Sequence, residues 1–277
     1  MIRPEQKKLF AVVGNPVRHS LSPAMMSAAF ETMGVQAVYA ALFVDELARD
    51  LETLHRAGFS GLSVTIPYKE TACRLAVDVD ETAYEIGAVN TLRRSSNGWE
   101  GRNTDWIGAV RALSQAGAIE GRNALVLGAG GAARAVAYGL QRAGAEVTIA
   151  NRCAERGKSL SHQLHCRFIA LNVLEKKENN FNLVVQCTSL GLAGAEQSSP
   201  VSASFFRPEM LVMEIVYRPR HTVFSRAAEQ AGCTVVSGLD MLLYQGVAQI
   251  EWWLESAVTP PAVEAMRRAL ERAAGDE

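Results

Sequence analysis

A glycine-rich segment is the part of this sequence whose residue types most directly suggest ligand chemistry. Gly128-Ala129-Gly130-Gly131-Ala132-Ala133 follows the apolar run Ala124-Leu125-Val126-Leu127 and precedes a helical pattern that ends near Ala143. The segment fits the G-x-G-x-x-G/A pattern, in which glycine lets the backbone approach a pyrophosphate and the first N–H groups of the helix hold that anion. The alternative is a tight turn without a ligand. The strand–turn–helix context favours a dinucleotide site formed by Gly128, Ala129, Gly130, Gly131 and Ala132.

Basic residues follow the next predicted strand. Where a site for NAD would usually carry an acidic side chain, this sequence has Asn151-Arg152, with Arg156 one turn further. A guanidinium group can bind a 2′-phosphate through two hydrogen bonds, whereas a carboxylate would repel it. A solvated basic helix start is the simpler alternative, although an arginine in the first turn opposes the helix dipole. We therefore predict NADP rather than NAD.

Two ionisable residues stand where predicted helices begin. Lys69 follows the apolar run at Val64-Thr65-Ile66, and a lysine able to exchange a proton is what a carbonyl/alcohol interconversion needs. Asp105 comes just before the predicted helix 106–116. Each has a simpler interpretation: Lys69 is a solvated lysine, and either Thr104 or Asp105 is a helix N-cap worth about 1 kcal/mol.

Small polar residues follow the first predicted strand. Ser22 precedes Pro23, and this pair predicts a helix with serine as N-cap and proline in its first turn. Ser20 is not explained in that way, and a loop that leads from a strand into a helix is a place where α/β proteins bind anions. A substrate carboxylate would suit it. Asn90 follows another apolar run, where its amide could simply satisfy backbone groups.

Short apolar runs that alternate with helical patterns position these residues. In the first part of the chain, this alternation predicts a parallel sheet with helices on its faces. The same rhythm restarts at Asn123, so the sequence predicts two α/β units. Expected strands are 9–13, 38–43, 61–66, 124–127, 146–150, 182–187, 211–216 and 234–236, and expected helices are 22–33, 45–57, 69–76, 106–116, 132–143, 239–254 and 262–273.

Composition narrows the class of protein. A chain of 277 residues with 48% apolar and 21% charged residues is typical of a globular protein of about two domains. With 28 basic and 29 acidic side chains, it lacks the charge expected for binding nucleic acid or an anionic membrane. Its five cysteines form no C-x-x-C pair, and no apolar stretch is long enough for a membrane span or signal, which favours the cytoplasm. The spacing of Cys153, His162, His165 and Cys166 matches no zinc pattern, so we predict no metal.

Seven segments, taken in order, resemble the shikimate dehydrogenase family over about 10–254. Any one of them alone is weak, but their order is highly specific. They are Gly14-Asn15-Pro16 with His19-Ser20-Leu21-Ser22-Pro23, then Ser63-Val64-Thr65-Ile66-Pro67-Tyr68-Lys69, Gly87-Ala88-Val89-Asn90-Thr91, Asn103-Thr104-Asp105, the glycine-rich segment, Asn151-Arg152 with Arg156, and 238–245.

The resemblance implies a two-domain α/β fold and an activity. Residues 1–104 with 241–277 would form a substrate-binding domain with a parallel α/β sheet. Residues 105–240 would form a Rossmann-type NADP-binding domain, with a cleft between the two. The implied reaction is the reversible NADPH-dependent reduction of 3-dehydroshikimate to shikimate, in the biosynthesis of aromatic amino acids.

The resemblance also implies site residues. Lys69 and Asp105 would be the catalytic pair beside the reacting oxygen. The substrate would be bound by Ser20, Ser22, Thr65, Lys69, Asn90, Asp105, Tyr217 and Gln245. The cofactor would be bound by Gly128, Ala129, Gly130, Gly131, Ala132, Asn151, Arg152, Arg156, Thr188, Ile215 and Gly238.

Three positions depart from the family pattern. Gln186 stands where asparagine is usual, and Glu214 stands where aspartate is usual ahead of Tyr217. Both precede residues expected beside the nicotinamide, so they bear on cofactor geometry and rate more than on the fold. Ser63 replaces the commoner asparagine, which we interpret as a tolerated change.

Two alternative functions fit the same segments. One is a quinate/shikimate dehydrogenase that uses NAD; Ser22 and the absence of an acidic residue at Asn151 argue against it. The other is a non-catalytic sensor of a metabolite from the same pathway, which the presence of both Lys69 and Asp105 argues against. In every case we expect a small-molecule ligand, no nucleic-acid or membrane partner, and a monomer or homodimer.

Overall fold

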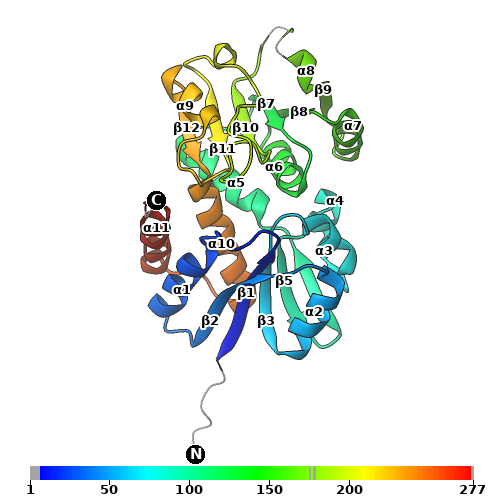
Figure 1. The fold of residues 1–277 in the computed structure, drawn as a ribbon, viewed down its shortest axis with the longest axis vertical. Helices are drawn as coiled ribbons and strands as arrows, with labels where there is room; N and C mark the ends of the chain where they lie inside the picture. Colours follow the sequence, from blue (N-terminus) through cyan, green and yellow to red (C-terminus); the bar gives the residue numbers. More distant parts are fainter. Residues whose placement is uncertain (1–6, 175, 177–178, 276–277) are drawn as a thin grey trace, which may run out of the picture. The chain divides into compact units, whose positions relative to one another are not determined.

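The computed structural model describes residues 7–174, 176 and 179–275, and the chain divides into two compact units (Figure 1). The first unit comprises Met1–Thr104 and Gln245–Glu277, and the second comprises Asp105–Tyr244. The ends of the predicted substrate domain, 1–6 and 276–277, lie outside the described residues. The first unit is therefore assembled from two stretches of chain that are distant in sequence.

The first unit is built on a six-stranded sheet in the order β2-β1-β3-β5-β6-β4. Its first three strands are parallel, as the alternation of strands and helices predicts. The antiparallel hairpin of β5 and β6, which we did not predict, extends the sheet beyond β3. The elements are β1 (Lys8–Gly14), α1 (Ser22–Thr32), β2 (Ala37–Phe43), α2 (Leu47–Arg56), β3 (Phe59–Val64), α3 (Lys69–Leu75), β4 (Asp78–Val79), α4 (Glu81–Ile86), β5 (Thr91–Ser95), β6 (Gly98–Arg102) and α11 (Pro260–Gly275).

Strand β1 is apolar from Leu9 onward because both of its faces are covered there. Phe10 stacks on Phe30 of α1 at 5.1 Å and on Trp253 at 4.9 Å between ring centroids. The next residue along the strand, Ala11, belongs to the apolar cluster on the other face, which includes Leu47 and Leu51 of α2. A buried parallel strand accordingly reads as a continuous apolar run rather than as an alternating one.

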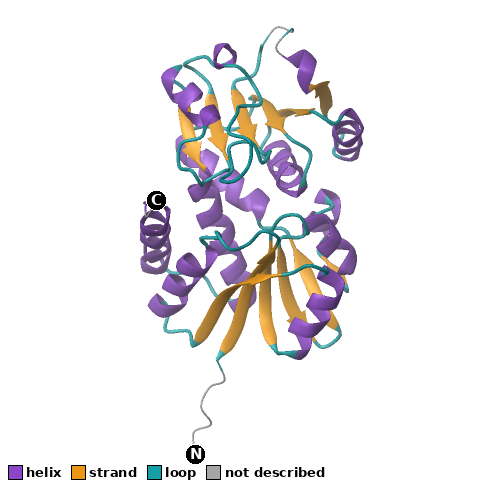
Figure 2. Cartoon of the chain, in the orientation of Figure 1, coloured by secondary structure: helices purple, strands orange, loops and turns teal. Residues whose placement is uncertain are grey.

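The second unit contains six parallel strands in the order β12-β11-β10-β7-β8-β9 (Figure 2). This is the doubly wound order, in which the direction of winding reverses between β7 and β10 and ligands bind at the carboxyl ends of the strands. The elements are α5 (Asp105–Ala116), β7 (Asn123–Leu127), α6 (Gly131–Arg142), β8 (Glu146–Asn151), α7 (Ala154–Gln163), β9 (Arg167–Ala170), α8 (Leu171–Leu174), β10 (Leu183–Gln186), η1 (Ala203–Phe205), β11 (Leu211–Glu214), α9 (Val223–Gln230), β12 (Thr234–Ser237) and the start of α10 (Gly238–Leu254). From Gln245 onward, α10 belongs to the first unit.

The expected α/β class with a doubly wound cofactor-type unit is confirmed. Boundaries shift by a few residues; for example, β3 and β11 end two residues before the predicted 66 and 216. Among the described residues, no helix has both the length and the apolar composition needed to cross a membrane.

Candidate active site

Four adjacent strands of the second unit end at the same edge of the sheet. Strands β7, β10, β11 and β12 end at Leu127, Gln186, Glu214 and Ser237, and neighbouring strands in this order are hydrogen-bonded to one another. Because all four are parallel, the residues that follow them gather at this edge. The structure thus brings together the predicted cofactor residues Gly128, Thr188, Ile215 and Gly238.

The glycine-rich segment forms an open turn at this edge. Gly128 has a φ of +120°, and a Cβ atom there would lie 3.1 Å from the carbonyl oxygen of Cys187. Gly130 occupies the N-cap of α6 in extended conformation, and no atom of the surrounding chain lies within 4 Å of where its Cβ would be. The space beside Gly130 at the start of α6 is therefore open. This arrangement fits the pyrophosphate of a dinucleotide.

The predicted phosphate-reading residues follow β8, the strand next to β7. Asn151 is the last residue of β8, and its Nδ2 donates to the carbonyl oxygen of Cys153 at 2.8 Å. Arg152 and Arg156 are exposed, Arg156 in the first turn of α7. Glu155, also exposed, lies between them and was not considered in the sequence-based prediction. Two guanidinium groups and one carboxylate are thus exposed in the segment that follows β8.

Gly238 is required by the close approach of two backbone segments. A Cβ atom at Gly238 would lie 2.4 Å from the carbonyl oxygen of Ile215 and 2.9 Å from that of Glu214. Contacts this short exclude any side chain without displacement of the backbone. The first residue of α10 consequently rests directly on the residues that follow β11.

Gln186 and Glu214 are buried side chains beneath this edge, with Glu214 only 2% exposed. They face each other as register partners at the ends of β10 and β11. Burial raises the pKa of the Glu214 carboxyl to about 7, although hydrogen bonds from Val216, Thr222 and Gln186 act in the opposite direction. The two departures from the family pattern are therefore in contact.

Predicted substrate residues of the first unit also follow its strands. Ser22 is the first residue of α1, and the N-cap position is held by Leu21 without a side-chain cap. The prediction that Ser22 caps the helix was wrong. The helix begins at Ser22 itself, so this residue lies inside the helix and not at the N-cap position. Ser20 Oγ accepts a hydrogen bond from the backbone N–H of Ser22 at 3.3 Å. Ser20 and Ser22 are thus held together at the end of the β1 loop.

Thr65 and Lys69 lie on the neighbouring loop, which follows β3. The N–H of Thr65 donates to Val13 at 3.0 Å, and a Cβ atom at Gly14 would lie 2.4 Å from Thr65 Cγ2. The loops after β1 and β3 are therefore packed on each other, which requires glycine at position 14. Lys69 is half-buried and begins α3, and its carbonyl accepts from the N–H of Val89 at 2.9 Å.

Asn90 and Gln245 are joined directly. Asn90 Nδ2 donates to Gln245 Oε1 at 3.2 Å and to Thr104 Oγ1 at 3.0 Å, while Asn90 Oδ1 accepts from the N–H of Thr104 at 2.7 Å. Asn90 is buried, so these bonds fix its amide. The contact also fixes the Gln245 amide with its oxygen toward Asn90.

A chain of buried hydrogen bonds that was not predicted from the sequence leads to Asn90. Tyr39 Oη donates to Ser63 Oγ at 2.7 Å, and Ser63 Oγ donates to Gln249 Oε1 at 2.6 Å. Gln249 Nε2 then donates to Thr91 Oγ1 at 3.0 Å, and Thr91 bonds to Asn90. Gln249 lies four residues after Gln245, on the same face of α10, and this spacing is the signal that could have found it.

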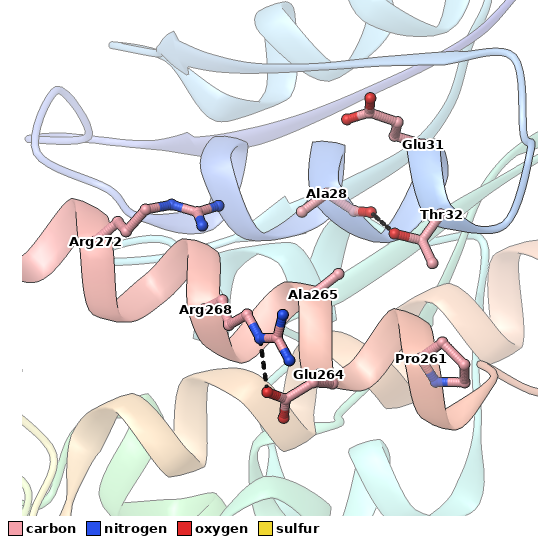
Figure 3. Close-up of a pocket in the computed structure, with 8 residues that line it drawn as sticks. All are labelled: Ala28, Glu31, Thr32, Pro261, Glu264, Ala265, Arg268 and Arg272. Carbon is pink, nitrogen blue, oxygen red and sulfur yellow. Dashed lines mark hydrogen bonds and ion pairs between the residues drawn. The ribbon is translucent and has the colours of Figure 1, made fainter.

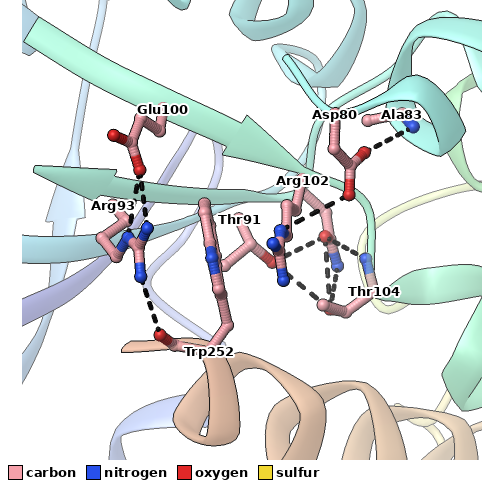
Figure 4. A network of polar contacts seen from close by, with 9 residues as sticks. Asp80, Ala83, Thr91, Arg93, Glu100, Arg102, Thr104 and Trp252 are labelled. Atoms are coloured by element: carbon pink, nitrogen blue, oxygen red, sulfur yellow. Dashed lines mark hydrogen bonds and ion pairs between the residues drawn. The ribbon is translucent and has the colours of Figure 1, made fainter. Parts of the chain in front are cut away.

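A second set of polar contacts braces the strand that leads to Thr104 (Figure 4). The indole of Trp252 lies between two guanidinium groups, 4.8 Å from Arg93 and 4.7 Å from Arg102 to the ring centroid. Arg93 also pairs with Glu100 at 2.9 Å, and Arg102 pairs with Asp80 at 3.5 Å. These contacts tie α10 to the β5–β6 hairpin.

A hollow of about 560 Å³ lies between α1 and α11 (Figure 3). Within it, Arg268 Nε donates to Glu264 at 2.8 Å, and Arg272 and Glu31 line the remaining walls. None of the predicted site residues lines this hollow. Volume alone is therefore a poor guide to the site in this protein, and the strand ends described above are the better candidate.

The predicted catalytic residues belong to different units. Lys69 lies in the first unit, whereas Asp105, buried at the first residue of α5, lies in the second. Tyr217 follows β11 and is likewise in the second unit.

Comparison with known proteins identifies the family to which this chain belongs. A curated shikimate dehydrogenase (NADP(+)) from Syntrophobacter fumaroxidans is 58% identical over 273 residues, which cover 98% of this chain and 96% of that protein. The chain belongs to the shikimate dehydrogenase family. Models of this family match the shikimate dehydrogenase substrate binding domain at residues 12–92, shikimate / quinate 5-dehydrogenase at 111–213 and the shikimate 5′-dehydrogenase C-terminal domain at 238–271.

Solved structures of the shikimate dehydrogenase family share the fold. Shikimate 5-dehydrogenase from Thermus thermophilus, in complex with NADP(H) and shikimate, superposes with a TM-score of 0.87 at 37% identity, covering 96% of this chain and 99% of that one. Quinate dehydrogenase from Corynebacterium glutamicum, in complex with NAD, superposes with a TM-score of 0.86 at 25% identity, covering 96% and 99%.

Proposed function

We propose that this protein catalyses the reversible NADPH-dependent reduction of 3-dehydroshikimate to shikimate, in the biosynthesis of aromatic amino acids. The observation that carries the proposal is the 58% identity, over nearly the whole of both chains, to a shikimate dehydrogenase (NADP(+)). The first unit would bind the substrate and the second the cofactor. We also propose a cytoplasmic protein that acts as a monomer or homodimer.

Lys69 and Asp105 are the proposed catalytic residues. When bound, the nicotinamide supplies a hydride equivalent to the carbonyl carbon of the substrate. The Lys69 ammonium donates a proton to the carbonyl oxygen and stabilises the negative charge that develops there. Asp105 accepts a hydrogen bond from the neighbouring hydroxyl. In shikimate oxidation, Lys69 takes the proton back.

The remaining proposed substrate residues would orient the ring. Ser20 and Ser22 would bind the carboxylate, a role supported by their position in the loop after β1. Ring hydroxyls and the surroundings of the carboxylate would be bound by Thr65, Asn90, Tyr217 and Gln245. The bond between Asn90 and Gln245 supports a rigid pair of amides whose orientation is set before the substrate arrives.

For the cofactor, the open turn at Gly128 to Ala132 would hold the pyrophosphate. Asn151, Arg152 and Arg156 would hold the adenosine phosphate, since a guanidinium group can bind a phosphate through two hydrogen bonds. Thr188, Ile215 and Gly238 would line the nicotinamide. The shared edge formed by the ends of β7, β10, β11 and β12 supports this assignment.

Quinate oxidation with NAD is the second candidate, favoured by the similarity to the quinate dehydrogenase structure. Steady-state rates with shikimate and quinate, each with NADP and NAD, separate the two. We expect absorbance at the reduced-nicotinamide band to rise fastest with shikimate and NADP. Faster turnover of quinate with NAD would overturn the proposal, and binding of shikimate without any turnover would indicate a sensor.

The lysine is tested by Lys69→Ala, with the exposed Lys158→Ala as a matched control. We expect the first variant to lower kcat by about 100-fold or more, because it removes the general acid/base, and the second to leave kcat unchanged. An active Lys69→Ala protein would remove the proposed mechanism.

A further inference from the structure

Two loops leave the sheet of the second unit side by side. The β10 loop, 187–197, follows Gln186 and contains Thr188, and the β11 loop, 215–222, follows Glu214 and contains Ile215 and Tyr217. Strands β10 and β11 are paired, with Gln186 opposite Glu214. The last residue of each strand is thus the point from which its loop departs.

Gln186 holds the β10 loop. Its side-chain Oε1 accepts a hydrogen bond from the N–H of Thr188, and its Nε2 donates to the carbonyl oxygens of Leu190 at 3.1 Å and Thr188 at 3.4 Å. One buried amide therefore satisfies three backbone groups of the loop, which fixes the position of Thr188 relative to the strand.

Glu214 holds the β11 loop in the same way. One carboxyl oxygen accepts from the N–H of Val216 at 2.9 Å, and the other accepts from the hydroxyl of Thr222 at 2.7 Å. These bonds reach both ends of the loop, from the residue after Ile215 to the N-cap of α9. A carboxylate can accept at both oxygens, whereas an amide can accept only at one.

The two loops are also joined to each other. Gln186 lies opposite Glu214 where the two strands end, and the Gln186 side chain acts to lower the pKa of the Glu214 carboxyl. The N–H of Ala193 donates to the carbonyl of Arg218 at 3.0 Å. Gly191, at φ +84°, approaches Thr222 so closely that a Cβ atom would lie 3.0 Å from its side chain. The two loops are therefore in direct contact with each other as well as with the strand ends.

We propose that Gln186 and Glu214 act as a pair of positioning residues that set the nicotinamide wall through the two loops. This inference rests on the proposed function, because that function assigns Thr188, Ile215 and Gly238 to the cofactor. Gly238 strengthens the link, since its backbone rests on the carbonyl groups of Glu214 and Ile215. Neither Gln186 nor Glu214 is a catalytic residue in this scheme; each acts through the loop that it holds.

The protonation state of Glu214 determines which hydrogen bonds it can make to the β11 loop. Its pKa of about 7 follows from burial. A small hollow of about 110 Å³ adjoins it, and the other charged or titratable groups lining that hollow are Arg220, His221 and Glu229. Protonation converts one acceptor oxygen of Glu214 into a donor. On the oxygen that faces the Val216 N–H, the proton removes that hydrogen bond; on the oxygen that faces Thr222, the bond persists only with its direction reversed, so that the Thr222 oxygen accepts. Protonation therefore rearranges the bonds that hold the loop to the strand.

The test compares Glu214→Gln, which keeps the shape of the side chain, with Glu229→Gln as the matched control. Glu229 lines the same hollow but pairs with His221, at 3.2 Å. For Glu214→Gln we expect kcat for shikimate oxidation to fall about tenfold, while KM for shikimate and Kd for NADPH change by less than about threefold. We expect Glu229→Gln to behave as wild type.

The fluorescence of bound NADPH gives a readout that a merely structural role would not move. Between pH 6 and pH 8 we expect it to change in the wild type and to stay constant in Glu214→Gln. A folded Glu214→Gln protein with wild-type kcat would overturn the proposal, as would a wild-type signal that does not vary with pH. If the wild type binds NADPH but does not oxidise shikimate, the proposed function fails, while the fluorescence still tests the positioning role.

A second pair of variants covers the case in which Glu214→Gln does not fold. Thr222→Val removes the hydroxyl that donates to Glu214, whereas Thr222→Ser retains it. We expect the valine variant to lower kcat and alter the fluorescence of bound NADPH, and the serine variant to restore both. Equal kcat and equal fluorescence in the two variants would overturn the proposal.

Discussion

The buried carboxyl of Glu214 makes the stability of this protein depend on pH in a way that one substitution can remove. Its pKa is about 7 in the folded chain, against 4.5 for an exposed glutamate. The folded state therefore binds this proton more tightly than the unfolded state does. The contribution of Glu214 to stability is fully present below pH 4.5, falls as the pH rises, and reaches its lowest value above pH 7.

The size of the effect follows from the shift. Each pKa unit corresponds to about 1.4 kcal/mol, so the free energy of unfolding loses on the order of 2–3 kcal/mol between pH 5 and pH 8 through this one group. In Glu214→Gln that loss is absent. Other titrating groups act equally in both proteins, so they cancel in the difference between variant and wild type.

Urea unfolding followed by circular dichroism at pH 5, 6, 7 and 8, without cofactor, measures this difference. We expect Glu214→Gln to gain about 2–3 kcal/mol relative to the wild type from pH 5 to pH 8. Glu229→Gln serves as the control because its carboxyl is not buried. A difference between Glu214→Gln and the wild type that stays constant within about 0.5 kcal/mol over this range would refute the reasoning.

Three further predictions concern single side chains. Arg152→Ala should raise KM for NADPH at least about tenfold more than KM for NADH, measured in steady state, because only NADPH carries the phosphate that the guanidinium binds; equal effects would mean that Arg152 does not read it. Gly238→Ala should raise KM for NADP and lower kcat, since its Cβ atom would collide with the Ile215 carbonyl, whereas Gly275→Ala, which has no neighbour within 4 Å, should do neither. Gln249→Leu removes the acceptor of the buried Ser63 hydroxyl and the amide that donates to Thr91 Oγ1, and it should lower the free energy of unfolding by about 2 kcal/mol in urea; no loss would show that these two bonds are dispensable.

The sequence predicted those parts of the fold that local patterns dictate. Apolar runs located β1, β2 and β7, and the glycine-rich segment located the turn before α6, because each depends on residues close in sequence. The β5–β6 hairpin was missed, since its strands carry charged residues such as Arg93 and Glu100 whose pairing is visible only across the hairpin. The assignment of Ser22 as the N-cap was wrong by one residue. Which of two adjacent residues becomes the N-cap depends on backbone angles, and residue types alone do not determine these angles.

The candidate site likewise has parts that could be predicted from the sequence and parts that could not. Thr188, Ile215 and Gly238 were assigned through the family resemblance, and the strand order that gathers them at one edge became visible only in the structure. The chain of bonds through Tyr39, Ser63 and Gln249 could not be predicted, because its members come from three distant segments and each alone looks like an ordinary buried polar residue. The assignments of Lys69 and Asp105 remain predictions.

The discontinuity of the first unit has a consequence for its synthesis. Phe10 packs against Trp253, and Arg93 and Arg102 lie over the ring of Trp252. The sheet of the first unit, whose strands are translated first, therefore needs side chains that are translated at least about 150 residues later. On the ribosome, the uninterrupted second unit has all of its strands before the first unit has its closing helices. A nascent chain therefore exposes part of the apolar face of the first unit for most of its elongation. A stop codon shortly before position 252 would leave that face exposed to water, even though all the strands of the described sheet had been synthesised.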